Sequence, residues 1–285
     1  MAAIEVRRLN IDLSQGFPRH WLGGDAFRSQ LFNALSMSFP LGEQFFIDSV
    51  RAAQAQISDP QLLEDIRGFI GQEATHRHLH AQYNEQLFKQ GLKYVMEPWV
   101  KRRLKASAHL SVRSNLAVTM AYEHFTAIFA DVVLRDKLEN AAEPAKSLWQ
   151  WHAVEETEHK SVAFDAYRAI GGGYKLRVGW YVYVWLMFLI DVICQTGNNL
   201  YRDGQLFKPR TWFSAIGYLL GKKGLLWDLI PQGFSYLRPG FTPWDQDNGE
   251  LASNWLHANR DTYRVLGATK DPDIASAAKK TATTA

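Results

Sequence analysis

The sequence predicts an all-α protein: a four-helix bundle followed by an aromatic-rich helical extension. Apolar residues between about residues 25 and 170 recur at helical spacing, and no stretch before residue 173 alternates with period two for long enough to be a convincing strand. Helix start and stop signals divide the same region into four long segments joined by short links. We therefore expect residues 1–173 to form the bundle, 174–267 to pack on it, and the small, polar residues 268–285 to be a disordered tail.

The first two helices have clear boundaries in the sequence. After an irregular segment at residues 1–24, the first is expected at about 25–57, with Pro40 kinking or breaking it near its middle. Ser58 or Asp59 should cap the second helix, which stops at Gly91.

The other two helices are bounded by Pro- and Gly-containing segments. The motif "MEPW" opens the third, at about 99–135, and "NAAEP" precedes the fourth, which ends at the glycines 171–173. The link after Gly91 is fairly short, so the position of a long crossover, and with it the topology, stays open.

Composition narrows the function classes. Hydrophobic residues make up 47% of the 285 residues and charged residues 21%, which is ordinary for a globular protein with a substantial core. The net charge is only +3 and no basic block alternates with aromatics, so nucleic acid is not an expected partner. A single cysteine, Cys194, and an N-terminus without an apolar signal segment fit a cytoplasmic location.

Two Glu-x-x-His pairs are the main candidates for chemistry. Glu73 and His76 lie on the second predicted helix, and Glu156 and His159 lie on the fourth. Residues three apart on a helix share a face, so each pair can reach one point. Such a pair arises easily by chance, and its placement is what makes it informative.

A matching carboxylate lies on the first helix of each predicted hairpin. Glu43 is about 15 residues before the turn at 58–59 and Glu73 about 14 after it, and Glu123 and Glu156 flank the turn near 139–140 in the same way. The six groups could therefore meet in the middle of the bundle. Four carboxylates and two imidazoles suit a pair of iron or manganese ions, whose charge would offset the burial of the carboxylates.

This order of residues resembles the ferritin-like di-metal carboxylate proteins over roughly residues 25–170. The chain also resembles the family labelled predicted metal-dependent hydrolases, over most of its length. The resemblance implies a ferritin-like bundle that binds two metal ions, iron, manganese or a mixture, with Glu73 and Glu156 as the bridges. The implied ligands are Glu43, Glu73, His76, Glu123, Glu156 and His159.

Three neighbouring residues are candidate catalytic groups. His80 follows Glu73 by seven residues and His152 precedes Glu156 by four, so each is either an extra ligand or proton relay, or a core histidine. Thr126, one turn after Glu123, resembles the Thr beside the oxygen-binding face of acyl-carrier-protein desaturases and some bacterial monooxygenases. The alternative is a hydroxyl that bonds its own helix backbone.

Other polar residues near the pairs have less direct roles. Gln72 and Glu155, each just before a ligand glutamate, are candidates for accepting the outer ring proton of the ligand histidines, because similar di-iron oxygenases use an acid there. Asp48, Asp131 and Asp165 are alternatives. His78 should lie on the surface, and His124 should pack beside the site.

Three functions fit these residues. The first is O2-dependent oxidation, such as hydroxylation or desaturation, of a hydrophobic small molecule or an acyl or lipid substrate, with O2 and a separate electron donor as partners. The second is a metal-dependent hydrolase that uses a metal-bridging hydroxide. The third is non-enzymatic, ferritin-like iron binding. The first is favoured by analogy, because a carboxylate-rich helix bundle is a redox environment. Homodimer formation and peripheral membrane contact are left open.

The aromatic extension raises a separate question. Residues 178–190 are thirteen residues without charge, fewer than the roughly 20 of a bilayer span. We expect this segment to be buried against the bundle as a roof over the metals, forming one wall of an apolar pocket beside Thr126. An interfacial helix and a true span are the alternatives. Residues 211–230, with Lys222 and Lys223, predict either a lid or a surface on lipid headgroups, and 236–248 a loop.

Overall fold

The protein is all-α, as the sequence predicts, apart from one two-stranded sheet. The computed structural model describes residues 4–246 and 248–266, so the predicted disordered tail lies outside the described residues. The helices in chain order are α1 (Ala26–Ala53), α2 (Pro60–Lys89), α3 (Glu97–Ser107), α4 (Val112–Val132), α5 (Ala145–His159), α6 (Val162–Ala169), α7 (Tyr174–Arg202), α8 (Pro209–Leu220), α9 (Leu225–Ser235) and α10 (Gly249–Ala258).

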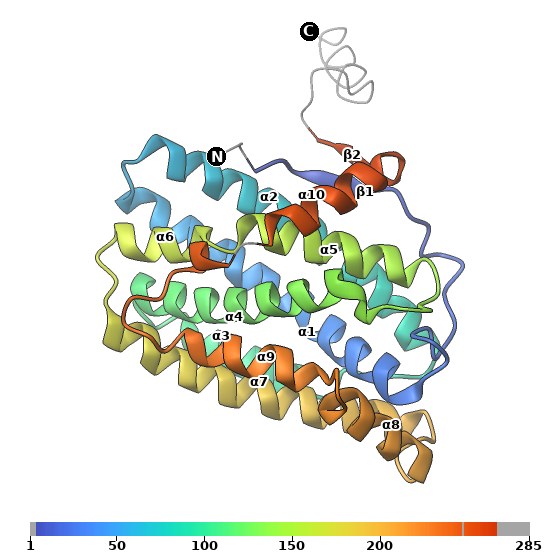
Figure 1. Ribbon diagram of the computed structural model, residues 1–285. Helices are drawn as coiled ribbons and strands as arrows, with labels where there is room; N and C mark the ends of the chain where they lie inside the picture. The colour runs from blue at the N-terminus through green and yellow to red at the C-terminus, as the bar shows by residue number, and fades with distance from the viewer. Residues whose placement is uncertain (1–3, 247, 267–285) are drawn as a thin grey trace, which may run out of the picture.

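The centre of the molecule is a bundle of α1, α2, α4 and the α5–α6 pair (Figure 1). Helix α1 packs along α2, α4 packs along α5 and α6, and contacts between α1 and α4 and between α2 and α5 close the bundle. The connection from α2 to α4 is residues 90–111, which include α3. The long crossover that the sequence left open therefore lies here, and the likeness of the bundle to ferritin stays a prediction.

Side-chain caps start the first two helices. The Asp25 side chain accepts a hydrogen bond from the Arg28 amide at 2.9 Å, which begins α1. Of the two candidates for α2 the cap is Asp59, and Pro60 occupies the first helical position. Gly91 follows the end of α2 with φ +89°, a conformation that glycine adopts without steric cost.

Pro40 lies inside α1 without breaking it, so of the expected kink or break the break is wrong. A proline cannot donate the hydrogen bond that the carbonyl four residues earlier would accept. That carbonyl belongs to Ser36, and the Asn84 side chain of α2 donates to it at 2.9 Å. A neighbouring helix thus replaces the missing backbone bond.

The third predicted helix is two helices. Instead of one helix over 99–135, α3 ends at Ser107 and α4 begins at Val112, and a π-helical turn follows at Val133–Lys137. The Ser111 side chain caps α4 by accepting from the Ser114 amide, and Asn115 satisfies the Ser107 carbonyl. The side chains at this turn therefore supply the bonds that a continuous helix would have made.

The fourth predicted helix is also divided, at Lys160 and Ser161, into α5 and α6. The Lys160 ammonium donates to the Gln246 carbonyl and to the Asn248 side chain, both at 2.5 Å. These partners lie in the segment before α10, so the break is tied to a distant part of the chain.

The N-terminal segment, expected to be irregular, contains strand β1 (Arg7–Leu9), which pairs antiparallel with β2 (Tyr263–Val265). The segment crosses α2 closely at Gly68 and Gly71. A Cβ atom at Gly71 would lie 2.3 Å from a Val6 methyl group, so a larger residue there would displace the strand. This crossing places β1 over the middle of the bundle.

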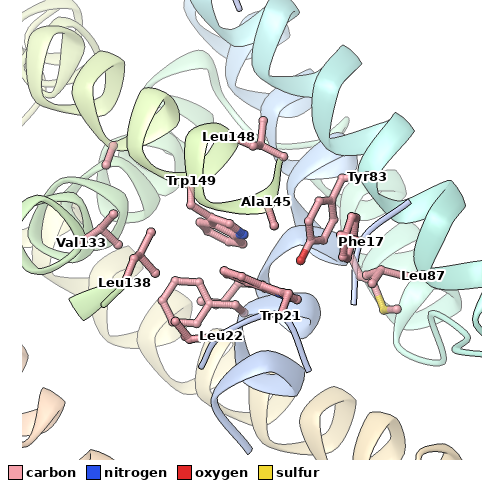
Figure 2. Close-up of a cluster of buried hydrophobic side chains, with 14 of the residues drawn as sticks. Phe17, Trp21, Leu22, Tyr83, Leu87, Val133, Leu138, Ala145, Leu148 and Trp149 are labelled. Carbon is pink, nitrogen blue, oxygen red and sulfur yellow. The ribbon is translucent and has the colours of Figure 1, made fainter. Parts of the chain in front are cut away.

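Two hydrophobic clusters fill the two ends of the bundle. One surrounds Trp21, Tyr83 and Trp149 (Figure 2). The other surrounds Phe69 and Leu116. Along each of α1, α2, α4 and α5–α6, the predicted metal ligand falls between the part in one cluster and the part in the other. The site is therefore closed off from both ends by apolar packing.

The extension does not bury its apolar segment, contrary to the prediction for residues 178–190. Helix α7 packs on α1 and α4, and α9 packs on α4. Only 22% of an apolar 18-residue stretch of α7 is nevertheless buried. Of residues 178–190, Tyr181 and Val184 are the buried ones, and Asp191 on the same side pairs with Arg103, while Trp185 and Leu189 are exposed. Among the described residues, α7 and the mostly buried segment Val112–Arg135 are long and apolar enough to cross a membrane, by length and composition only.

Candidate metal centre

The structure brings all six predicted ligands together in the middle of the bundle, where each is at most 2% exposed. They come from α1, α2, α4 and α5. Their donor atoms form two groups, and within each group the atoms lie within 4.8 Å of one another. The first group is Glu43, His76 and His152, and the second is Glu73, Glu123, Glu156 and His159. His152, one of the candidate catalytic residues, therefore belongs to the same cluster.

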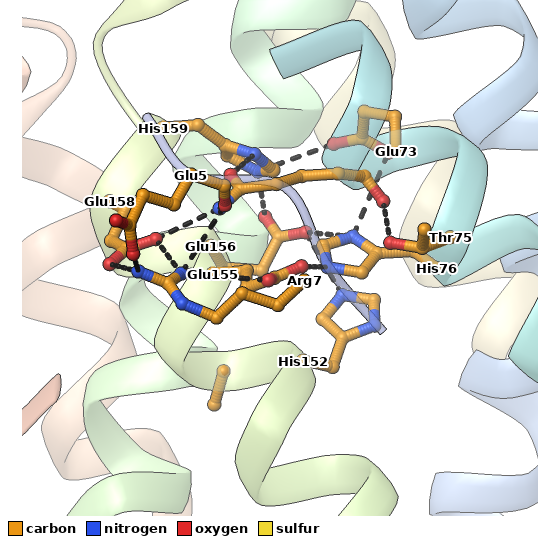
Figure 3. A network of polar contacts seen from close by, with 12 residues as sticks. Glu5, Arg7, Glu73, Thr75, His76, His152, Glu155, Glu156, Glu158 and His159 are labelled. Atoms are coloured by element: carbon orange, nitrogen blue, oxygen red, sulfur yellow. Dashed lines mark hydrogen bonds and ion pairs between the residues drawn. The ribbon is translucent and has the colours of Figure 1, made fainter. Parts of the chain in front are cut away.

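Glu73 and Glu156, both in the second group, lie between His76 of the first group and His159 of the second (Figure 3). One oxygen of Glu156 is 3.4 Å from Nδ1 of His76, and the other is 3.3 Å from Nε2 of His159. For Glu73 the corresponding distances are 4.0 Å and 3.2 Å. A carboxylate with one oxygen toward each histidine has the arrangement that a bridge between two metal ions requires.

The two histidines of the Glu-x-x-His pairs are oriented by outer partners on the residues predicted for that role. Nε2 of His76 lies 3.0 Å from the Glu155 carboxylate, and Nδ1 of His159 lies 3.1 Å from Oε1 of Gln72. Each partner is an acceptor, so each ring carries its proton on the outer nitrogen. The bare nitrogen of each ring therefore faces the carboxylates.

A chain of hydrogen bonds through Asn84, Ser36 and His80 fixes the tautomer of His152. Asn84 donates to the Ser36 carbonyl, so its oxygen accepts from the Ser36 hydroxyl at 2.8 Å. The hydroxyl must then accept from Nδ1 of His80, at 2.8 Å, and Nε2 of His80 must accept from Nδ1 of His152, also at 2.8 Å. A neutral His152 is left with a bare Nε2, 3.0 Å from a carboxylate oxygen of Glu156.

The lone pair on this Nε2 and a lone pair on the Glu156 oxygen, 3.0 Å away, repel each other unless a cation lies near both. His152 thus has the orientation of a third imidazole ligand, and His80 that of its outer partner. Burial, together with the neighbouring histidines, lowers the pKa of His152 to about 4 and the pKa of His80 well below its usual value, so both rings are neutral at pH 7.

Unpaired polar atoms test whether this cluster fits metal ions. Both oxygens of Glu43, Glu73 and Glu123 are buried without a hydrogen-bond partner, as are the inner nitrogens of His76 and His159. Buried polar groups nearly always have partners, and leaving one unpaired costs about 1–3 kcal/mol. So many bare acceptors converging on one place fit divalent cations as the missing partners.

The charges of the four carboxylates also fit divalent cations in this cluster. Burial and neighbouring carboxylates raise the pKa of Glu73 and Glu123 well above the usual range, and burial with Glu156 does the same for Glu43. Burial also acts to raise the pKa of Glu156, but His159 and His152 outweigh it and hold that pKa well below its usual value. Four ionised carboxylates are therefore unfavourable here without compensating positive charge.

A small cavity adjoins the cluster beside Thr126. Its volume is about 20 Å³, room for about one water molecule. Apolar side chains of α1, α4 and α5 form most of the wall, and Thr126, His152 and Glu156 supply its polar atoms. The Thr126 hydroxyl donates to the Glu123 carbonyl at 3.0 Å, which is the backbone bond considered as the alternative for this residue.

The extension lies elsewhere. None of the residues that line this cavity comes from 174–245, so the predicted roof is wrong for the cavity beside Thr126. The extension instead covers the outer side of α4, where the Gln232 carbonyl contacts the buried His124 ring at 3.0 Å. Helix α7 packs on α1 and α4, and the wall of the cavity between α4 and α5 is formed by side chains of the bundle itself.

No pattern in the sequence marked Arg7, which supports the residues that orient the ligand histidines. From β1 it forms two hydrogen bonds to Glu158, at 2.6 and 3.0 Å, and lies 3.6 Å from Glu155 (Figure 3). Glu158 in turn accepts from Gln72 at 2.8 Å. Arg7 therefore supports both outer partners, Glu155 and Gln72. Ser36 and Asn84, also missed, could have been found by helical phase, seven residues before Glu43 and four after His80.

Together the fold and the donor set define a class: an all-α protein whose bundle centre holds a carboxylate–histidine cluster with two candidate metal positions. The family model described as predicted metal-dependent hydrolase matches residues 5–247, and the chain belongs to that family. No curated protein and no solved structure matches. The family description indicates a metal-dependent enzyme, and it favours the hydrolase alternative over the oxidation expected first.

The contacts of Arg7 with Glu155 and Glu158 lead to a first prediction. Replacing Arg7 with Met should weaken metal binding by about tenfold, the lower end of the range for outer-shell partners, because Glu155 and Glu158 lose the cation that positions them. A competition titration with a chromogenic chelator measures this. The matched control is Arg8→Met on the same strand, where the side chain is exposed. Equal affinities for both variants would contradict the positioning role.

Proposed function

We propose that the protein is a hydrolase that uses two divalent metal ions to cleave an uncharged acyl ester or amide with an apolar group. The observation that carries this proposal is the pair of donor groups in one buried cluster, with one oxygen each of Glu73 and Glu156 directed toward His76 and the other toward His159. The family description supports the same reaction type.

Each position in the cluster has a defined role in this proposal. Glu43, His76 and His152 would hold one ion, Glu123 and His159 the other, and Glu73 and Glu156 both. The donor set of carboxylates and imidazoles suits iron or manganese. Two such ions, when bound, lower the pKa of water and polarise a carbonyl or phosphoryl oxygen. Glu155, Gln72 and His80 fix the rings so that their bare nitrogens face inward.

The cavity beside Thr126 suggests the kind of substrate. Phe39, Phe129 and Trp149 form an apolar wall next to Glu156, and no Lys or Arg lines it. A phosphate ester would need cationic partners there, whereas an acyl chain would not. At about 20 Å³ the cavity holds no acyl chain, so substrate entry requires these aromatic side chains to move.

A set of p-nitrophenyl esters of increasing acyl length tests the proposal under anaerobic conditions. We expect metal-dependent hydrolysis whose kcat/KM rises by up to about fourfold for each methylene group that is buried. Glu73→Ala protein, purified in parallel, controls for contaminating esterases. Absence of metal-dependent hydrolysis across esters and the matching anilides would refute the proposal.

O2-dependent oxidation is the second candidate. The observation in its favour is the cavity itself, which is apolar, adjoins Glu156 and Thr126, and is of a size for a small molecule such as O2. Reductant-dependent oxygen uptake by the iron-loaded protein, absent in Glu73→Ala, would support this reaction. Metal analysis of protein purified without chelators identifies the native ions for either reaction.

A further inference from the structure

Helices α7, α8 and α9 expose an unusual number of large apolar side chains. They lie on the side of the molecule away from α2 and the strands (Figure 1). This α7–α9 face consists of Val182, Tyr183, Trp185, Leu186, Leu189, Ile190, Ile193, Phe207, Trp212, Phe213, Ile216, Leu220, Trp227, Ile230 and Phe234, each at least 43% exposed. An exposed apolar surface that extends over several helices marks an interaction site.

The opposite side of α7 holds the helix on the bundle. There Asn199 donates to the Gln30 carbonyl of α1 at 3.3 Å, and Gln195 donates to the Lys93 carbonyl between α2 and α3 at 2.8 Å. Asp191 pairs with Arg103 of α3. Leaving the bundle to cross a membrane would unpair these buried groups, each at some cost in free energy. Helix α7 is therefore suited to lie along an apolar phase, with one face in contact with it.

The charges around this face are almost all positive. Between residues 174 and 238 the exposed cations are Lys175, Arg202, Lys208, Arg210, Lys222, Lys223 and Arg238. The exposed acid in the same range is Asp228, which pairs with Lys137 at 3.3 Å. Basic residues beside exposed Trp, Tyr and Phe are the composition of surfaces that bind anionic lipid headgroups.

We propose that the α7–α9 face docks on the surface of an anionic lipid bilayer. Helix α8 leads the contact, because Phe207 and Phe213 are the most exposed of these side chains, at 83% and 75%. Lys208 and Arg210 precede or begin α8, and Lys222 and Lys223 follow it, so the ends of α8 meet the headgroups while its apolar face enters the interface. A second copy of the chain is a poorer partner, since a symmetric dimer would place like charges on both sides of the interface. This inference does not depend on the reaction catalysed.

Vesicle flotation with the full-length protein, without detergent, tests the proposal. We expect binding to vesicles of phosphatidylcholine with 30% (about one lipid in three) phosphatidylserine, and weak binding to phosphatidylcholine alone. Lys222→Glu/Lys223→Glu should lower the partition coefficient by at least roughly 30-fold on the anionic vesicles. Phe213→Ser/Ile216→Ser should lower it as well, without changing the thermal unfolding midpoint, because both side chains are exposed.

The matched control is Arg8→Glu/Arg67→Glu, which makes the same change in net charge at exposed positions on β1 and α2. It should bind anionic vesicles far better than the Lys222/Lys223 variant. Three results would overturn the proposal. The first is that the wild-type protein does not float with anionic vesicles. The second is that the control variant loses as much binding as the Lys222/Lys223 variant. The third is that the wild-type protein forms a dimer without binding vesicles, and the Phe213/Ile216 substitutions dissociate that dimer. Resistance to alkaline carbonate extraction would show a spanning helix instead.

Discussion

Replacing Glu73 or Glu156 with Ala should abolish binding of the metal pair and, with it, turnover. Each carboxylate has one oxygen toward His76 and one toward His159, so either change removes a donor from both metal positions. The loss should exceed the roughly 10- to 100-fold effect of outer-shell changes. Metal content after dialysis, measured by inductively coupled plasma mass spectrometry, is the readout.

His78→Ala is the control for this prediction, because His78 lies on the same helix with an exposed side chain. Its metal content should equal that of the wild type. The metal-free Glu73→Ala variant should also remain folded, since the substitution removes two buried oxygens that have no partner. Two equivalents of tightly bound metal in either Ala variant would show that Glu73 and Glu156 are not the bridges.

Removing the metal should destabilise the protein more at pH 7.5 than at pH 5. Burial and neighbouring carboxylates raise the folded-state pKa of Glu43, Glu73 and Glu123 above the unfolded value of 4.5. Between 4.5 and the raised values, the metal-free folded state binds more protons than the unfolded state. Its unfolding free energy therefore falls as pH rises through this window. Glu156, whose lowered pKa lies below this window, is ionised in both states there and adds nothing. The lowered pKa values of His80 and His152 oppose the trend below their unfolded value of 6.5, but both rings are neutral with and without metal, so they do not change the effect of the chelator.

Metal ions bind the ionised carboxylates, so their stabilising effect grows over the same pH range. A ligand at 100 to 1,000 times its Kd stabilises by about 3–4 kcal/mol, and each kcal/mol shifts the midpoint by about 2–4 °C in a domain of this size. We expect a chelator to lower the unfolding midpoint by roughly 6–16 °C at pH 7.5 and by clearly less at pH 5. Scanning calorimetry with and without chelator measures it. In Glu73→Gln the difference between the two pH values should shrink, and a chelator effect independent of pH would contradict the explanation.

The α7–α9 face belongs to the extension, which does not line the cavity at Glu156. The cavity at Glu156 lies between α4 and α5, while the extension covers the outer side of α4. The predicted roof was wrong because aromatic density alone does not tell which side of a helix faces the protein. In α7 the inward positions hold Arg177, Asp191 and Gln195 as well as Tyr181 and Val184, and most of the large apolar residues point outward.

The sequence by itself determined the fold class, the start of the second helix at Ser58 or Asp59, and the six residues that now lie together. These inferences hold because they rest on local rules. Helical periodicity places residues three and four apart on one face, and equal distances from a turn bring two antiparallel helices into register at Glu43 and Glu73. Gln72 and Glu155, just before the two ligand glutamates, followed instead from the resemblance to di-iron oxygenases, which use an acid at this place.

The tertiary structure alone decided the rest. Arg7 reaches the site from a strand whose pairing partner is more than 250 residues away, and no local pattern marks such a contact. Whether Pro40 breaks its helix depended on Asn84 in a neighbouring helix. The orientation of His152 depended on a hydrogen-bond chain through His80 to α1, because a neutral imidazole shows which nitrogen is bare only through the partner of the other.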